Sequence, residues 1–179
     1  MSTRGRRDPA PEDFHPRPVE RGDLLGIQQL LRRIVDFRDK DRREAQSFAS
    51  HALDHPRDRA FEVHVGEWDD AVVGYLCLGP NPLTDGVFDL YWIAVDPDHE
   101  GRGLGGALLA YAEERAVRRA GRMMLIETSS APGYRRQRNF YRHRGYERVA
   151  RIPDFFAVDE HKVIYRKVLA PEKPRRRAR

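Results

Sequence analysis

The chain has 179 residues, of which 40% are hydrophobic and 34% are charged, with 33 Lys and Arg against 28 Asp and Glu. This length suits a single domain with an adequate core. The single cysteine, Cys77, excludes an intrachain disulfide and a cysteine-based metal site, and we predict no metal. The N-terminal segment lacks the apolar stretch of a signal peptide, and no apolar run is long enough to span a membrane, which predicts a soluble, cytoplasmic protein.

The net charge of +5 is concentrated near the C-terminus. Residues 171–179 hold five basic residues and one glutamate, which together contribute four of the five net charges. This segment and residues 1–13 have too few apolar side chains to offset the entropy cost of ordering, so we predict disordered tails around one folded domain over residues 14–170. A nucleic-acid-binding role is not favoured, because the basic excess lies on a short tail rather than on a folded surface.

The first predicted elements are a short strand and two helices. The strand covers residues 18–21, and the Asp23 side chain is suited to cap the helix that follows. The apolar residues of that helix recur every three or four positions, at Leu24, Ile27, Leu30, Leu31 and Ile34. A more polar helix over residues 41–53 is expected to end before Pro56.

The middle of the chain predicts three strands. Residues 61–68 alternate between apolar and polar side chains and lead through two aspartates into residues 71–78, a pattern typical of a β-hairpin. A loop over residues 80–86 precedes the most apolar strand, residues 87–95, which is expected at the centre of a sheet.

The last third of the chain returns to alternating helices and strands. A helix over residues 103–120 is expected to end at Gly121, which suits a left-handed helix cap. A strand over residues 123–126 and a short helix over residues 136–143 follow. Two further strands are predicted at residues 146–152 and 162–168. This order predicts an α/β protein with a β-α-β crossover.

A glycine-rich turn joins the apolar strand to the helix after it. Four of its six residues are glycine, at Gly101, Gly103, Gly105 and Gly106. Glycine removes the side chains that would keep a ligand away from the backbone, so several N–H groups can converge on one anion at the start of the helix. The turn therefore predicts a pyrophosphate-binding site.

The glycine spacing matches two classes of pyrophosphate site. Gly101-x-Gly103-x-x-Gly106, with Glu127 about twenty residues further on, also fits the dinucleotide-binding fingerprint. In that motif the first glycine follows the strand directly, whereas five residues intervene here. Only 52 residues remain after Glu127, too few for the further strands and helices of a dinucleotide-binding domain. A nicotinamide or flavin site is therefore disfavoured, and no P-loop sequence is present.

Glu100-Gly-Arg-Gly103-Leu-Gly105 instead resembles the acyl-CoA pyrophosphate loop of the GNAT N-acetyltransferase superfamily. The resemblance covers about residues 17–169, including the strand end Trp-Ile-Ala-Val-Asp-Pro, a strand ending in Glu127, and Asn-Phe-Tyr141-Arg-His-Arg-Gly. Glu100 departs from the usual Gln or Arg and should face solvent, away from the anion. Tyr134 stands where many members have a cofactor-contacting Asn. The resemblance implies one α/β domain with a mixed, mostly antiparallel sheet of six to seven strands flanked by helices.

The same resemblance implies that an acetyl group passes from acetyl-CoA to a primary amine of a small molecule, peptide or protein, by direct attack in a ternary complex. It places the pantetheine arm on the backbone of Ile93, Ala94 and Val95. It places the pyrophosphate on the turn, at Gly101, Arg102, Gly103, Leu104, Gly105 and Gly106. The expected partners are acetyl-CoA and the amine acceptor, and a homodimer is left open.

Three residues are candidates for proton transfer, because an ammonium must lose a proton before it attacks and the departing thiolate gains one. By resemblance, Asp89 matches the base of histone-acetylating members, and Glu127 matches the base of ribosomal-protein N-terminal acetylating members. The choice between them, or a water chain that joins them, stays open. Tyr141 aligns with the tyrosine that protonates the thiolate. Each residue also has a structural alternative. Asp89 could form a hydrogen bond at the start of its strand, Glu127 could be a rim or structural carboxylate, and Tyr141 could pack in the core.

Some features leave other functions open. A non-catalytic acyl-CoA sensor would keep the glycine turn and lose the proton-transfer residues, so the presence of all three candidates argues against it. Seven arginines between residues 135 and 151 favour steering of an anionic cofactor, or plain solvation, over nucleic-acid binding. The acceptor is expected to contact residues 32–56, 80–86 and 152–161. Aromatic residues that either line its pocket or belong to the core are Trp68, Tyr91, Trp92 and Phe155.

Overall fold

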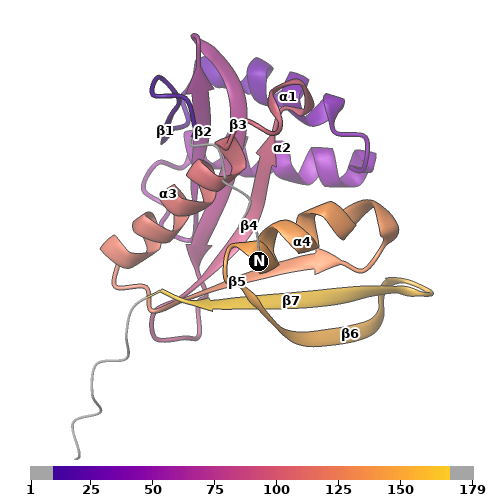
Figure 1. Ribbon diagram of the computed structural model, residues 1–179. Helices are drawn as coiled ribbons and strands as arrows, with labels where there is room; N and C mark the ends of the chain where they lie inside the picture. The colour runs from indigo at the N-terminus through magenta and orange to yellow at the C-terminus, as the bar shows by residue number, and fades with distance from the viewer. Residues whose placement is uncertain (1–9, 170–179) are drawn as a thin grey trace, which may run out of the picture. The chain divides into compact units, whose positions relative to one another are not determined.

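The computed structural model describes residues 10–169, which form four α-helices and seven strands (Figure 1). The helices are α1 (Leu24–Arg33), α2 (Asp39–Asp54), α3 (Leu104–Arg118) and α4 (Arg135–His143). The strands are β1 (His15–Pro18), β2 (Glu62–Trp68), β3 (Ala71–Pro80), β4 (Val87–Val95), β5 (Met123–Ser129), β6 (Glu147–Ala157) and β7 (Glu160–Val168).

The strands form one sheet in the order β1-β2-β3-β4-β5-β7-β6. Strand β4 pairs with β5 in parallel, and β1 with β2, β2 with β3, β5 with β7 and β6 with β7 pair antiparallel. The predicted mixed, mostly antiparallel sheet is therefore confirmed. No helix within residues 10–169 is both long and apolar enough to cross a membrane.

The chain divides into two compact units. The first runs up to Leu78 and includes Trp92–Ala112, and the second consists of Gly79–Tyr91 and the chain from Glu113 onward. The single folded domain over residues 14–170 stays a prediction. The predicted tails lie outside the described residues, except for residues 10–13, where Pro11 accepts a hydrogen bond from the Phe14 N–H.

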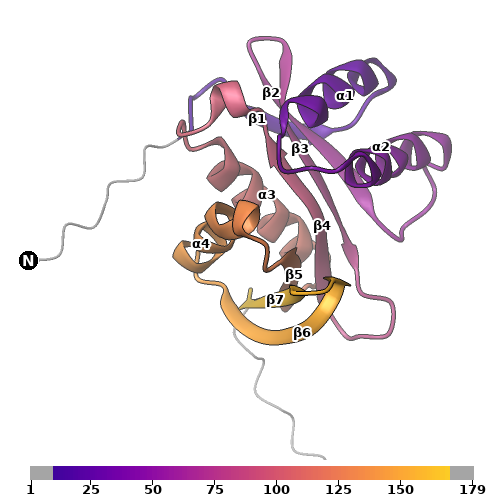
Figure 2. The ribbon, with the colours of Figure 1, turned by 90° about the vertical axis from the view of Figure 1, so that its right-hand side faces the viewer.

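In the first unit, α1 and α2 cover one face of β2 and β3 (Figures 1 and 2). The apolar stripe predicted for α1 is buried at Ile27, Leu30 and Leu31. These side chains share a core with residues at alternate positions of the two strands, including Val63, Val65, Tyr75 and Cys77. Alternation places these strand residues on one face because successive strand side chains point to opposite sides. The Tyr75 hydroxyl is buried and donates a hydrogen bond to the Ala45 carbonyl at 2.7 Å.

The hairpin predicted between residues 61 and 78 is present. Its turn residues Asp69 and Asp70 have φ values of 50° and 58°, the left-handed conformation that two-residue hairpin turns require and that aspartate tolerates. On the face of β3 away from α1 and α2, a Cβ added at Gly74 would lie 2.8 Å from Leu108 of α3. Glycine at this position therefore lets the helix approach the strand closely.

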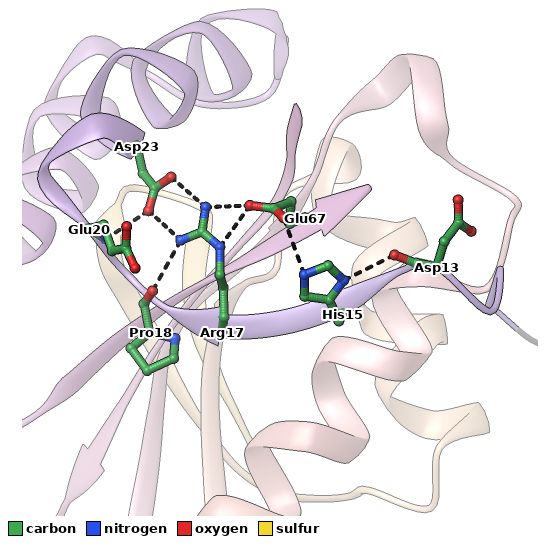
Figure 3. A network of polar contacts seen from close by, with 7 residues as sticks. All are labelled: Asp13, His15, Arg17, Pro18, Glu20, Asp23 and Glu67. Carbon is green, nitrogen blue, oxygen red and sulfur yellow. Dashed lines mark hydrogen bonds and ion pairs between the residues drawn. The ribbon is translucent and has the colours of Figure 1, made fainter. Parts of the chain in front are cut away.

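The start of the domain differs from the prediction. The first strand is β1, over His15–Pro18, whereas residues 21–23 form a 3-10 turn. Asp23 precedes α1, but its carboxylate does not cap that helix. It accepts hydrogen bonds from the Arg17 guanidinium at 2.8 Å and from the Glu20 N–H at 2.7 Å (Figure 3). The Asp23 carboxylate oxygens, which the sequence predicted would cap α1, therefore accept hydrogen bonds from Arg17 of β1 instead.

The second unit contains a cluster of buried tyrosines. The cluster consists of Tyr141 of α4, Tyr146 after that helix and Tyr165 of β7, and each is at most 3% exposed. The ring centroids of Tyr146 and Tyr165 each lie 6.0 Å from that of Tyr141. The Tyr146 hydroxyl donates to Glu113 at 3.0 Å, and Lys167 donates to the same carboxylate. The cluster joins α4 to β7 and to the second half of α3.

The end of α3 also corrects a prediction. The left-handed residue is Ala120, with φ of 60°, and Gly121 follows it. The Gly121 N–H donates to the Ala116 carbonyl at 2.7 Å, and a Cβ at Gly121 would lie 2.6 Å from that oxygen. Glycine is thus required at position 121 by the close approach to the helix end, one residue after the left-handed position.

Strands β5, β6 and β7 extend further than predicted. Strand β5 continues to Ser129 because Glu127, Thr128 and Ser129 pair with β7. Strand β6 continues past Ile152 to Ala157, where the hairpin to β7 turns. Its side chains are exposed at almost every position, so hydrophobic periodicity did not reveal its length.

Candidate functional site

The glycine-rich turn has the backbone conformation expected of an anion-binding loop. Gly101 and Gly103 have φ values of 79° and 80°, in the left-handed region that glycine enters without strain. The N–H groups of Gly106 and Ala107 donate to the Gly103 carbonyl, as the first turn of α3 begins. The N–H groups just before them, at Leu104 and Gly105, are in the part of a helix that has no intrahelical acceptor. These donors and the positive end of the helix suit a bound anion.

A buried carboxylate supports the segment just before this turn. Asp96 is 2% exposed and accepts hydrogen bonds from Arg33 Nε and from the Asp98 N–H, both at 3.1 Å. Its own N–H donates to the Val73 carbonyl at 2.9 Å. The His99 Nδ1 atom lies 3.7 Å from the same carboxylate. The end of β4 is therefore attached to both α1 and β3 where the glycine turn begins.

The side chains of the turn lie against an aromatic residue of β2. The Arg102 guanidinium lies 5.2 Å from the centre of the Trp68 ring, and the ring of His99 packs edge-on against Trp68 at 5.6 Å. The Trp68 indole N–H donates to Asp13 at 2.9 Å. Trp68 thus supports the turn. Glu100 is exposed, as expected for a carboxylate that should not face an anion.

The strand segment assigned to the pantetheine arm precedes this turn. Ala94 is 6% exposed and belongs to the core beneath α1 and α2, and the neighbouring Ile93 and Val95 are half-buried. Trp92 packs edge-on against Phe37 with centroids 5.4 Å apart, so it belongs to the periphery of that core. Because the Trp92 and Ala94 side chains are occupied by packing, a ligand at this segment would use the strand backbone.

In the second unit, the structure brings the two candidate bases into electrostatic contact. Asp89 of β4 is half-buried, and Asn81 donates a hydrogen bond to its Oδ2 atom at 2.9 Å. Burial raises the pKa of Asp89, the Asn81 hydrogen bond lowers it, and the negative charge of Glu127 raises it further, so that the pKa lies above its usual value. A raised pKa brings a carboxylate closer to the range in which it accepts a proton near neutral pH.

Glu127 of β5 has a different environment. Its side chain is 52% exposed, and its Oε2 atom lies 2.6 Å from the Lys162 ammonium. The Lys162 side chain is only 14% exposed, and its Nζ atom lies 3.7 Å from the centre of the Phe155 ring. Phe155 itself is 49% exposed. Phe155, one of the aromatic residues proposed for an acceptor pocket, thus contacts the lysine that pairs with a candidate base.

Tyr141 is buried to 2% exposure, and burial raises the pKa of its hydroxyl well above the usual value. The ring contacts Phe140 as well as the two buried tyrosines near it. A phenol with a raised pKa stays protonated and so remains able to donate. The structure shows the packing role of Tyr141, and the donor role that the sequence left as an alternative stays a prediction.

The sequence did not single out Asn81, Lys162 or Arg33. Asn81 bonds to Asp89 across 8 residues of sequence, and Lys162 bonds to Glu127 across 35. Arg33 bonds to Asp96, just before the glycine-rich turn, across 63. The only available signal was weak: an Asn in the loop before the central strand.

The arginines of residues 135–151 do not act as one group, since Arg138 donates to the carbonyls of Ser129 and Ala131 and thereby ties α4 to the end of β5. Within residues 10–169, no group of three or more His, Cys, Asp or Glu side chains could hold a metal ion.

Known proteins resemble this chain along most of its length. A family model of the GNAT acetyltransferase domain matches residues 59–148. An S-(2-succino)cysteine N-acetyltransferase from Bacillus subtilis is 28% identical over 134 residues, which cover 73% of this chain and 81% of that protein.

Solved structures agree. A GNAT-family acetyltransferase structure from Desulfovibrio desulfuricans is 32% identical and covers 88% of this chain and 99% of its own, with a TM-score of 0.84. A structure from Salmonella typhimurium with its cofactor acetyl-CoA has the same fold at a TM-score of 0.70 and 17% identity, covering 93% of this chain and all of its own (100%). The chain therefore belongs to the GNAT acetyltransferase family and is an acyltransferase.

Proposed function

We propose that the enzyme acetylates a primary amine by direct attack on acetyl-CoA in a ternary complex. The amine nitrogen forms a bond to the acetyl carbon as the bond from that carbon to sulfur breaks. Counted from the ammonium form of the acceptor, the products are an amide, the thiol of coenzyme A and one proton. The observation that carries the proposal is the glycine turn at the start of α3, with left-handed glycines at positions 101 and 103. The first N–H groups of a helix have no intrahelical acceptor and favour an anion such as the diphosphate of the acyl donor.

The cofactor-binding roles follow the local geometry. We assign the diphosphate to the turn, at Gly101, Arg102, Gly103, Leu104, Gly105 and Gly106. We assign the pantetheine arm to the backbone of Ile93, Ala94 and Val95. These residues bind and orient the thioester, and the chemical step needs separate groups that move protons.

Proton transfer is assigned to three side chains of the second unit. A lysine-type ammonium has a pKa of about 10.4 and an α-ammonium one of about 8, so a carboxylate must take a proton before attack. Asp89 or Glu127 accepts this proton. Tyr141 donates a proton to the departing thiolate, whose conjugate thiol has a pKa of about 8.5.

The acceptor we propose to test first is the α-amine of a small amino acid derivative. The Bacillus subtilis relative acts on S-(2-succino)cysteine and is 28% identical to this chain over 134 residues. The test is release of coenzyme A thiol from acetyl-CoA with S-(2-succino)cysteine, cysteine, polyamines, aminoglycosides and peptides. Turnover on one of these amines supports acetylation. Thermal stabilisation by acetyl-CoA without turnover on any amine would support a sensor instead.

A pair of glycine variants tests the donor site independently of the acceptor. A Cβ at Gly101 or at Gly22 would meet no atom within 4 Å, but only Gly101 has a left-handed φ. G101A forces alanine into a conformation that costs about 1–2 kcal/mol or displaces the turn. We expect its acetyl-CoA Kd to rise at least several-fold, whereas G22A should bind as the wild type does. Equal affinities of the two variants would contradict the assigned turn.

A further inference from the structure

Three charged side chains share one face of the sheet in the second unit. Asp89 of β4 pairs with Leu125 of β5, and Glu127 lies two residues further along the same strand. Glu127 pairs with Ile164 of β7, and Lys162 lies two residues away from Ile164. Because side chains two residues apart on a strand point to the same side, Asp89, Glu127 and Lys162 lie on the same face.

The two carboxylates on this face have partners of different charge. Asp89 bonds to the neutral amide of Asn81 at 2.9 Å, whereas Glu127 bonds to the Lys162 ammonium at 2.6 Å. The Phe155 ring, 3.7 Å from Lys162 Nζ, holds the ammonium from another side, since an aromatic face attracts a cation. The ammonium is thus fixed between Glu127 and Phe155.

We propose that Lys162 is a positioning residue that gives the two carboxylates different roles: by pairing with Glu127 it leaves Asp89, oriented by Asn81, as the group that accepts the proton of the amine. This inference rests on the proposed function and chooses between the two bases that it names. The proton moves from the ammonium to Asp89, and we assign it to Oδ1 because Asn81 occupies Oδ2.

The electrostatics support this division. The Lys162 ammonium donates a hydrogen bond to Glu127 Oε2 at 2.6 Å, so the Glu127 carboxylate is already held by a cation on this face. Burial and the charge of Glu127 both favour the protonated form of Asp89, and the Asn81 hydrogen bond opposes them. The charged side chains on this face are Glu127 of β5, Lys162 and Arg166 of β7, and Glu147 of β6. Arg166 pairs with Glu147 at 3.2 Å, and Asn81, in the loop before β4, contributes a neutral amide to Asp89.

The pH dependence of kcat/KM tests the proposal through its acidic limb, which reports the group that must be ionised. K162M leaves the charge of Glu127 uncompensated and should move the limb to higher pH by roughly one unit. E127Q removes that charge and should move the limb to lower pH. N81A removes a donor to the ionised carboxylate and should move it to higher pH. D89N should lose the limb and lower kcat about 100-fold or more.

Lys167 offers a matched control on the same strand. It pairs with Glu113 at 2.7 Å and lies near the Tyr146 ring, but its position on β7 places it on the opposite face from Lys162. K167M should leave the acidic limb in place, and K162R should restore it to the wild-type position. If the acidic limb of kcat/KM lies at the same pH in K162M as in K167M, Lys162 has only a structural role.

A second measurement does not depend on turnover. Side-chain carboxyl carbon shifts of Asp89, followed by NMR in the wild type and the same variants, should titrate in the same order as the kinetic limb. A limb lost in E127Q but kept in D89N would overturn the proposal in favour of Glu127. If the wild type acetylates no amine, the proposed function fails, and the Asp89 titration still decides whether Lys162 and Asn81 control this carboxylate.

Discussion

Arg33 of α1 and Asp96, the residue after β4, form an ion pair in which one partner is buried and the other is not. The Asp96 side chain is 2% exposed, and that of Arg33 is 44% exposed. The guanidinium reaches both carboxylate oxygens, through Nε and Nη2. The first helix is thereby attached to the strand end from which the glycine-rich turn starts.

Removing Arg33 should therefore affect both stability and donor binding. R33M leaves a buried carboxylate without its charged partner, which costs about 1–3 kcal/mol of unfolding free energy. We also expect a several-fold rise in acetyl-CoA Kd, because the turn loses its attachment to α1. Urea denaturation and calorimetric titration measure the two effects. Arg32 is exposed, and R32M is the control. Equal unfolding free energies and equal acetyl-CoA Kd values for R33M and R32M would contradict a supporting role for Arg33.

Tyr141 is expected to act through its hydroxyl rather than its ring. Y141F keeps the buried ring and should lower kcat about 100-fold, while the free energy of unfolding changes by about 1 kcal/mol or less. Because burial raises the pKa of Tyr141 above its usual value near 10, the wild-type donor should stay protonated, and its rate should not fall, up to at least pH 9. Y165F, at a neighbouring tyrosine that is 3% exposed, is the control. A kcat for Y141F equal to that of Y165F would assign Tyr141 to packing alone.

The Arg17 network should make the N-terminal part of the first unit sensitive to mutation (Figure 3). Arg17 bridges Asp23 at 2.8 Å and Glu67 at 2.5 Å, with a side chain only 25% exposed. R17M should lower the free energy of unfolding by about 1–3 kcal/mol. R21M, which breaks an exposed pair with Asp54, should cost at most about 0.5 kcal/mol. Equal losses in urea denaturation would show that the network adds nothing beyond a surface pair.

The same network predicts a pH dependence. Burial raises the pKa of Asp23, but the hydrogen bonds from Arg17 and from the Glu20 N–H outweigh it, and the pKa lies below its usual value. A carboxylate with a lowered folded-state pKa contributes stability above its unfolded pKa of about 3.9 and loses it as pH falls further. The stability gap between wild type and D23N should therefore be constant from pH 7 to about 5 and shrink below about 4. A gap independent of pH down to 3 would contradict the charged network.

The end of α3 offers a stabilising substitution. Ala120 adopts a left-handed φ of 60°, which costs an L-residue with a Cβ about 1 kcal/mol relative to glycine. A120G should raise the free energy of unfolding by roughly that amount. A110G, at an exposed position within the helix, should lower it by about 1 kcal/mol, because glycine loses more backbone entropy there. Destabilisation by both variants in urea titrations would mean that position 120 does not carry this strain.

The sequence predicted the helices, the hairpin and the central strand well because their signals are local. Apolar spacing gave the buried stripe of α1, and the alternation before Asp69 gave the hairpin. It misplaced β1, since that strand has no apolar pattern of its own and is defined by pairing of Arg17 with Val65 of β2. It assigned the left-handed helix cap to Gly121 rather than Ala120, because a glycine required by close packing and one required by backbone conformation look the same in a sequence.

The sequence by itself determined the family and the left-handed glycine turn before α3, because glycine enters the left-handed conformation without strain whatever surrounds it. Only the tertiary structure decided the environment of each candidate base. Lys162 reaches Glu127 through the register of β5 and β7, and Asn81 reaches Asp89 from the loop between β3 and β4. A carboxylate's affinity for a proton depends on burial and on charges a few ångströms away. Those neighbours are set by which strands pair, which residue order alone does not specify.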